Sequence, residues 1–152
     1  YKESVMQMKI YLDNCSYNRP YDDQSQIRIS LETQAKIYIQ DMIKNSELEL
    51  VTSYVLDYEN DQNRFEEKRK SIGCFMDDYS SYYVGIKHKK YVRETADKIM
   101  KTGVKEKDAA HIACALLAGC EYFITTDDRL LKYENDRIGI VTPVEFLRKI
   151  GV

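Results

Sequence analysis

The sequence predicts an α/β fold, a three-layer α/β/α domain built on a central, mostly parallel sheet of about five strands. Short strand-like runs alternate with longer amphipathic segments along the chain. Such alternation implies crossover connections, which place helices on both faces of a parallel sheet. Two of the runs also end directly in aspartate, at Asp13 and at Asp127.

The chain is expected to begin with a strand, a loop and a long helix. The continuous apolar run from Ile10 to Leu12 is typical of a strand buried on both faces. Residues 14–24 are polar and are expected to form a loop. Apolar residues at three- and four-residue steps predict a helix over residues 25–45, whose inner face would hold Ile27, Leu31, Ala35, Tyr38 and Met42.

A second and a third strand are expected at residues 48–53 and 82–86, since the latter run is rich in residues that favour pleated structure. The stretch between them, residues 54–79, is mostly helical by composition, with breaks near Asn60 and at Gly73. The remaining elements follow in order: a helix over 89–101 capped by Gly103, an Ala-rich helix over 105–118 closed by Gly119, strands at 121–126 and 138–141, and a terminal helix that starts at Pro143.

Length and composition are those of one domain. The chain has 152 residues, 43% of them hydrophobic, which is enough to bury a core without covalent staples. Residues 1–7 are set aside as an N-terminal extension or expression remnant, and residues 8–152 are expected to form the single domain. Without a membrane-length apolar stretch or a signal-peptide pattern, the sequence predicts a cytoplasmic protein that does not enter a membrane.

Cysteine spacing and charge narrow the function classes. The four cysteines show no Cys-x-x-Cys spacing and no paired histidines, so free thiols are expected rather than a zinc site. A net charge of −2 disfavours a nonspecific nucleic-acid binder. That objection weakens if the acidity is concentrated at a metal pocket. Carboxylates that converge at strand ends favour a hard cation, for which Mg²⁺ or Mn²⁺ is the usual choice.

Four short runs, in this order and spacing, resemble the successive motifs of PIN-domain proteins. They are YLDN at residues 11–14, SYVLDYE at 53–59, KDAAHIACA at 107–115 and FITTD at 123–127. The resemblance covers residues 8–147, nearly the whole chain. It implies a Mg²⁺- or Mn²⁺-dependent ribonuclease. The PIN-domain family includes the toxin components of bacterial toxin–antitoxin pairs.

The resemblance also implies an acidic quartet of metal ligands and catalytic residues, namely Asp13, Glu59, Asp108 and Asp127. Each acid has a structural alternative. Asp13 could simply begin a turn, and Asp108 could serve merely to stabilise the start of a helix. Glu59 has Asp57 as a neighbour on a charged helix, and Asp128 could be an accessory ligand or replace Asp127.

Further residues are candidates for supporting roles. His111 shares a helix face with Asp108 and is more often a packing or hydrogen-bonding residue than a base. Asn14, Ser16 and Thr125 are candidate donors that would hold carboxylates in place. Candidate phosphate contacts are Arg19, Lys105, Lys107 and Arg129. Of the 13 tyrosines, only Tyr17 and Tyr21 are expected near a substrate, while Tyr11, Tyr38 and Tyr122 are expected in the core.

The expected reaction is metal-assisted hydrolysis of RNA phosphodiester bonds, with single-stranded or looped RNA as the preferred substrate class. Two alternatives remain: a noncatalytic PIN-like module that binds a partner protein or nucleic acid, and a phosphatase with Asp13 as nucleophile. The phosphatase is disfavoured because Cys15 occupies the place of its general acid. Residues 14–20 depart from the shorter turn of toxin members. An antitoxin partner and a homodimer are expected possibilities.

Overall fold

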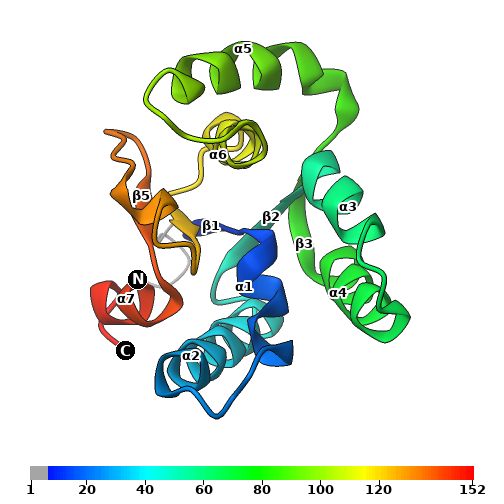
Figure 1. Ribbon diagram of the computed structural model, residues 1–152, viewed down its shortest axis with the longest axis vertical. Coiled ribbons are helices and arrows are strands. Elements are labelled where there is room, and N and C mark those ends of the chain that lie inside the picture. Colours follow the sequence, from blue (N-terminus) through cyan, green and yellow to red (C-terminus); the bar gives the residue numbers. More distant parts are fainter. Residues whose placement is uncertain (1–6) are drawn as a thin grey trace.

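A five-stranded, fully parallel sheet lies at the centre of residues 7–152, which are the residues that the computed structural model describes (Figure 1). The expected N-terminal extension, apart from Gln7, lies outside the described residues. The strands are β1 (Lys9–Leu12), β2 (Glu49–Ser53), β3 (Ser80–Val84), β4 (Tyr122–Ile124) and β5 (Gly139–Val141). Their order across the sheet is β3-β2-β1-β4-β5.

This strand order creates a switch point between β1 and β4. From β1 the chain builds outward through β2 and β3, then returns to place β4 on the other side of β1. Leu12 is in register with Ile124, and the next amide, Asp13 N, donates to Ile124 O at 3.1 Å. Both strands therefore end level with each other. The carboxyl edge at such a switch point is where ligands of open α/β sheets bind.

Helices cover both faces of the sheet, as the alternation of elements predicted. They are α1 (Asn14–Asn18), α2 (Ile27–Lys44), α3 (Tyr54–Asp61), α4 (Glu66–Tyr79), α5 (Lys89–Met100), α6 (Glu106–Leu117) and α7 (Pro143–Lys149). In Figure 1, α5 and α6 lie together on one side of the sheet, while α2 and α7 lie on the other. None of the helices within residues 7–152 is long and apolar enough to cross a membrane.

Polar residues at the strand ends start the helices that follow. The Asp13 side chain accepts a hydrogen bond from Ser16 N at the start of α1, and Ser53 accepts one from Leu56 N at the start of α3. Each cap satisfies an amide that the first helical turn leaves free. The strand-to-helix junctions thus need short polar side chains at the carboxyl edge.

Three local expectations were wrong. Residues 14–24 are not all loop, because the Asp13 cap starts α1 and Pro20 fits the first turn of a 3₁₀ helix, Arg19–Tyr21. Gly73 does not break a helix. It lies inside α4, and a Cβ added there would lie 3.5 Å from Asn60 Nδ2, which is an ordinary van der Waals distance. The break lies between α3 and α4, after Asp61.

The third error concerns the inner face of α2. Ile27, Leu31 and Tyr38 are exposed, and the helix instead buries Ala35, Ile39 and Ile43 together with the polar residues Glu32, Thr33 and Lys36. Glu32 can be buried because it is paired with arginines on both sides. The buried polar residues turn the helix away from its most apolar stripe. Tyr38 therefore is not a core residue, whereas Tyr11 is fully buried.

Candidate functional site

Asp13 lies directly after β1 and is 5% exposed. Its Oδ1 accepts hydrogen bonds from Ser16 N at 3.1 Å and from the Cys15 thiol at 2.7 Å. Burial raises the pKa of the Asp13 carboxyl, and the Cys15 hydrogen bond opposes that rise. The Ser16 hydroxyl takes another direction and donates to Ile124 O. Asp13 is thus a desolvated carboxylate held by the start of a helix.

Glu59, on α3, joins a chain of short hydrogen bonds that leads into the core. Its Oε1 lies 2.6 Å from His111 Nε2, and His111 Nδ1 lies 2.6 Å from the Tyr11 hydroxyl. That hydroxyl lies 2.7 Å from Ser53 Oγ. His111 is 2% exposed and comes from α6, so four elements, β1, β2, α3 and α6, meet here.

One assignment of protons satisfies this chain. Ser53 donates to Tyr11, Tyr11 donates to His111 Nδ1, and His111 donates from Nε2 to an ionised Glu59. Ser53 Oγ meanwhile accepts from Leu56 N. This series of hydrogen bonds thus holds the Glu59 side chain from the core side.

Asp108 and Asp127 face the same edge from other elements. Asp108 lies in the first turn of α6, where a carboxylate is favoured by the helix dipole. Burial raises its pKa, and the negative charges of Asp127 and Glu59 raise it further. Asp127, three residues after β4, accepts from Arg129 N at 2.9 Å and donates its own amide to Thr125 Oγ1 at 3.1 Å. The structure thus brings Asp108 within electrostatic reach of both Asp127 and Glu59.

The donors at this edge are of the kind that Mg²⁺ or Mn²⁺ would take, since they are carboxylate oxygens, and the charges of Asp127 and Glu59 raise the pKa of Asp108 although His111 and Arg129 oppose that rise. Their spacing is open. Among residues 7–152, no three side chains of His, Cys, Asp or Glu stand close enough together to form a metal-holding group. The donor chemistry fits a divalent cation, and an ion would have to draw these side chains inward.

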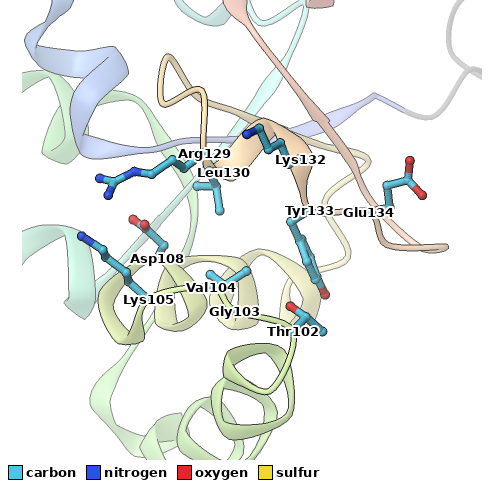
Figure 2. Close-up of a pocket in the computed structure, with 10 residues that line it drawn as sticks. All are labelled: Thr102, Gly103, Val104, Lys105, Asp108, Arg129, Leu130, Lys132, Tyr133 and Glu134. Carbon is cyan, nitrogen blue, oxygen red and sulfur yellow. The ribbon is translucent and has the colours of Figure 1, made fainter.

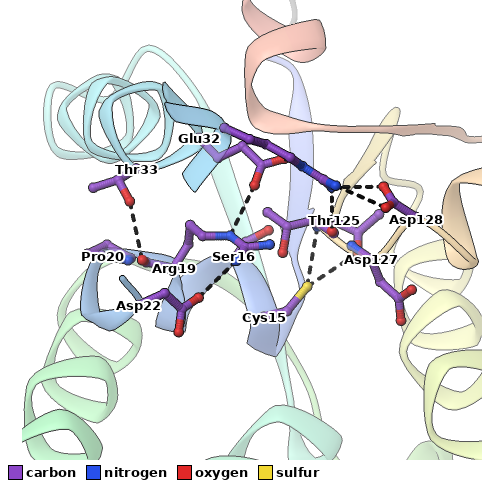
Figure 3. A network of polar contacts seen from close by, with 12 residues as sticks. Cys15, Ser16, Arg19, Pro20, Asp22, Glu32, Thr33, Thr125, Asp127 and Asp128 are labelled. Atoms are coloured by element: carbon purple, nitrogen blue, oxygen red, sulfur yellow. Dashed lines mark hydrogen bonds and ion pairs between the residues drawn. The ribbon is translucent and has the colours of Figure 1, made fainter. Parts of the chain in front are cut away.

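Asp128 has a different partner. Arg28, at the start of α2, makes two hydrogen bonds to its carboxylate, at 2.8 and 2.9 Å, and a third to Thr126 O at 3.1 Å. Arg28 holds the pKa of the Asp128 carboxyl below its usual range. Figure 3 shows Asp128 turned toward this ion pair and Asp127 turned away from it. The arginine therefore ties the loop that carries Asp127 to α2.

Glu32 extends this network. Its Oε2 lies 3.2 Å from Arg28 Nε, and its Oε1 lies 3.0 Å from Arg19 Nε, although the Arg19 N–H does not point well enough to count as a hydrogen bond. Arg19 also pairs with Asp22 at 3.0 Å (Figure 3). Arg19 is thus occupied by two carboxylates, unlike the other candidate phosphate contacts.

Those other cations lie around α6. Lys105 and Arg129 line a pocket of about 380 Å³ that also contains Asp108, and Lys107 is exposed on α6 (Figure 2). Asn14, another candidate, accepts hydrogen bonds from Asn18 and lines the surface beside Glu59. The expectation for Tyr17 was wrong, because it is 1% exposed and packs against Phe75. Tyr21 is exposed.

Sequence reasoning missed four residues at this edge. Tyr11 was placed in the core, but its hydroxyl supports His111. Arg28 gave no signal, because its partner lies 100 positions away. Lys132 and Tyr133, which line the pocket beside Asp108, follow the last motif and could have been found only from their proximity to it.

Comparison with known proteins places the fold. No family model matches this sequence, and no curated protein matches it. Among solved structures, a chain in the crystal structure of VapBC2 from Rickettsia felis, bound to a DNA fragment from their promoter, is similar. The TM-score is 0.53 over 88% of this chain and 97% of that chain, with 12% sequence identity. The likeness confirms the three-layer, PIN-like fold that the four motifs predicted.

Proposed function

We propose that this protein is a metal-dependent ribonuclease that hydrolyses RNA phosphodiester bonds through Asp13, Glu59, Asp108 and Asp127. The observation that carries the proposal is that Asp108 lies near enough to Asp127 and Glu59 for their negative charges to raise its pKa, beside the switch point of a PIN-like sheet. These acids come from three separate elements and would be costly to hold together for structural reasons alone.

The quartet would hold Mg²⁺ or Mn²⁺, which when bound activates water and neutralises charge on the scissile phosphate. The protein's own residues do the rest. His111 holds Glu59 in one orientation, and the Asp13 cap fixes the first ligand at the end of β1. Lys105 and Arg129, beside Asp108, would bind the phosphates of the substrate and align the backbone.

The biological setting we propose is that of a toxin with an antitoxin partner. VapBC2, whose fold this chain resembles, was crystallised with promoter DNA. A protein partner that covers the acidic edge would restrain such a nuclease, and a homodimer would fit the same setting. Residues 14–20 depart from the toxin pattern, so binding of an antitoxin is to be tested separately from RNA cleavage.

A noncatalytic PIN-like module that binds a partner is the second candidate. The observation that favours it is the open spacing of the acids within residues 7–152. Such a module would show no carboxylate-dependent affinity for Mn²⁺.

The test is cleavage of a mixed pool of structured and single-stranded RNAs, with Mn²⁺, Mg²⁺ or chelator. The wild type is compared with an Asp13→Asn, Asp108→Asn double variant and with Asp41→Asn, a matched change on the exposed face of α2. Cleavage that requires metal and is lost only in the double variant supports the nuclease. Equal cleavage by all three proteins sinks the assignment. Absence of cleavage together with Mn²⁺ affinity no better than that of the double variant would favour the noncatalytic module.

A further inference from the structure

The pocket beside Asp108 has features that the acidic quartet does not explain. It opens between the loop that precedes α6 and the segment that follows Asp127, and its volume is about 380 Å³. Pockets of roughly 300–1,000 Å³ accept small ligands, and this one is near the lower end. It therefore has room for about one nucleotide and is too small for a duplex.

The polar side of the pocket is cationic. Lys105, Arg129 and Lys132 line it, although the whole chain has a net charge of −2. Among the ion pairs of the described residues, neither lysine takes part, and Arg129 approaches Asp127 only at 3.8 Å. Of the two carboxylates at the pocket, Asp108 belongs to the quartet and Glu134 points away from the other side chains in Figure 2. Lys105 and Lys132 are thus available to an anion, and Arg129 adds a third positive charge that it shares with Asp127 across a long ion pair.

The opposite side of the pocket is apolar and open. The Tyr133 ring extends toward Thr102 and Gly103, with Leu130 and Val104 beside it (Figure 2). Asn135 Nδ2 donates to the Tyr133 hydroxyl at 3.0 Å, which holds the ring in place. At Gly103, which lines the same pocket, an added Cβ would meet nothing within 4 Å, so the pocket is open at this point.

We propose that this pocket binds one nucleotide of single-stranded RNA, with its phosphate on Lys105, Arg129 and Lys132 and its base against the Tyr133 ring. A free phosphate would use the cations alone, and an acidic peptide would have no use for the ring. A nucleotide uses both sides, since every base has a face that stacks on an aromatic ring. The position beside Asp108 makes this the neighbour of the scissile phosphate, a role that rests on the proposed function.

Binding can be measured without cleavage. Metal-free protein in chelator is titrated by NMR with 5′-AMP, with 5′-UMP, with inorganic phosphate and with a tetraglutamate peptide. The variants are Tyr133→Leu, Tyr133→Phe and Lys132→Ala, and Lys149→Ala on the exposed end of α7 is the control. Thermal unfolding of each variant confirms that it is folded.

We expect the shifts to centre on residues 102–108 and 129–134. Tyr133→Leu should weaken the binding of both nucleotides at least fivefold and leave phosphate binding unchanged. Tyr133→Phe, which keeps the aromatic ring, should bind the nucleotides as tightly as the wild type. Lys132→Ala should weaken binding of the nucleotides and of phosphate alike. The proposal is overturned if phosphate or tetraglutamate binds as tightly as the nucleotides, or if Tyr133→Leu has no effect on them.

The two proposals fail in different ways. If nucleotides bind as expected and no RNA is cleaved under any metal condition, the pocket stands and the nuclease falls. If RNA is cleaved through the quartet while Tyr133→Leu binds nucleotides like the wild type, the nuclease stands and the pocket assignment falls.

Discussion

His111 bridges Glu59 at the edge of the sheet to Tyr11 in its centre, with 2.6 Å on each side of the imidazole ring. The Tyr11 ring is itself fixed by stacking on Phe123 of the neighbouring strand, with ring centroids 5.3 Å apart. The orientation of a candidate metal ligand is therefore determined by core packing as well as by its own helix.

Removal of the Tyr11 hydroxyl should disturb this link. In Tyr11→Phe, the buried His111 Nδ1 and Ser53 Oγ each lose a partner, so we expect the free energy of unfolding to fall by about 1–3 kcal/mol. Mn²⁺ affinity should fall too, because Glu59 is held less firmly. Denaturant unfolding and calorimetric Mn²⁺ titration measure the two effects. Tyr122→Phe on β4 is the control, and an equal loss there would contradict the explanation.

The Arg28–Asp128 pair should matter more for activity than for stability. Asp128→Asn should leave the free energy of unfolding nearly unchanged, since the Arg28–Asp128 pair is largely exposed, whereas Arg28→Met and the double variant also remove a partner of the buried Glu32 and should be less stable. All three should reduce RNA cleavage to a similar extent, because each frees the loop that carries Asp127. Removal of the exposed Glu66–Lys70 pair is the control. Losses that add in the double variant would show that the two residues act separately.

Lys36 should make stability rise with pH in the alkaline range. The side chain is 7% exposed and its ammonium lies over the Tyr17 and Phe75 rings, and burial lowers its pKa to about 8. Between pH 8 and the usual value of 10.5, the unfolded chain binds a proton that the folded chain has lost, so the free energy of unfolding increases with pH. Below pH 8 the burial penalty is fully present.

The measurement is denaturant unfolding from pH 7 to 10.5. Lys36→Met should be more stable than the wild type at pH 7, by an amount on the order of 3 kcal/mol at most, and the difference should shrink with rising pH. Lys98→Met, at an exposed position of α5, should leave the pH profile as it is. Parallel wild-type and Lys36→Met profiles would refute the assignment.

Asp13 should stabilise the fold less than an asparagine would. Burial raises its pKa in the folded protein, so between pH 3.8 and that raised pKa the folded state binds the extra proton, and stability falls as pH rises. Asp13→Asn removes this cost and keeps an acceptor for Ser16 N, so we expect a higher Tm at pH 7. Such a trade between stability and function is typical of active-site acids.

Added Mn²⁺ should make the Tm of the wild type higher than that of Asp13→Asn. A ligand at 100 times its Kd stabilises the folded state by about 2.7 kcal/mol, and only the wild type retains the ligand at position 13. Thermal unfolding over a range of Mn²⁺ concentrations follows the effect. An identical rise of Tm in both proteins would show that the metal binds elsewhere.

The sequence was informative where the position of a residue follows from its neighbours along the chain. Asp13 and Asp127 could be placed at one edge because each ends an apolar run, and parallel strands bring such ends together. It was uninformative where partners are distant. The inner face of α2 follows from the Arg19 and Arg28 partners of Glu32, and the support of His111 follows from a tyrosine 100 positions away. Periodicity in one segment carries no information on such pairs.

Asp13 directly follows β1 and caps α1, and the Ser16 amide and the Cys15 thiol both donate to its Oδ1. That leaves Oδ2 as the atom with which Asp13 would hold an ion. Fraying of α1 would free the whole side chain to rotate, so the order of this five-residue helix and the occupancy of the proposed metal site would be thermodynamically linked. Slower amide exchange at Ser16 in the presence of Mn²⁺ would report that linkage directly.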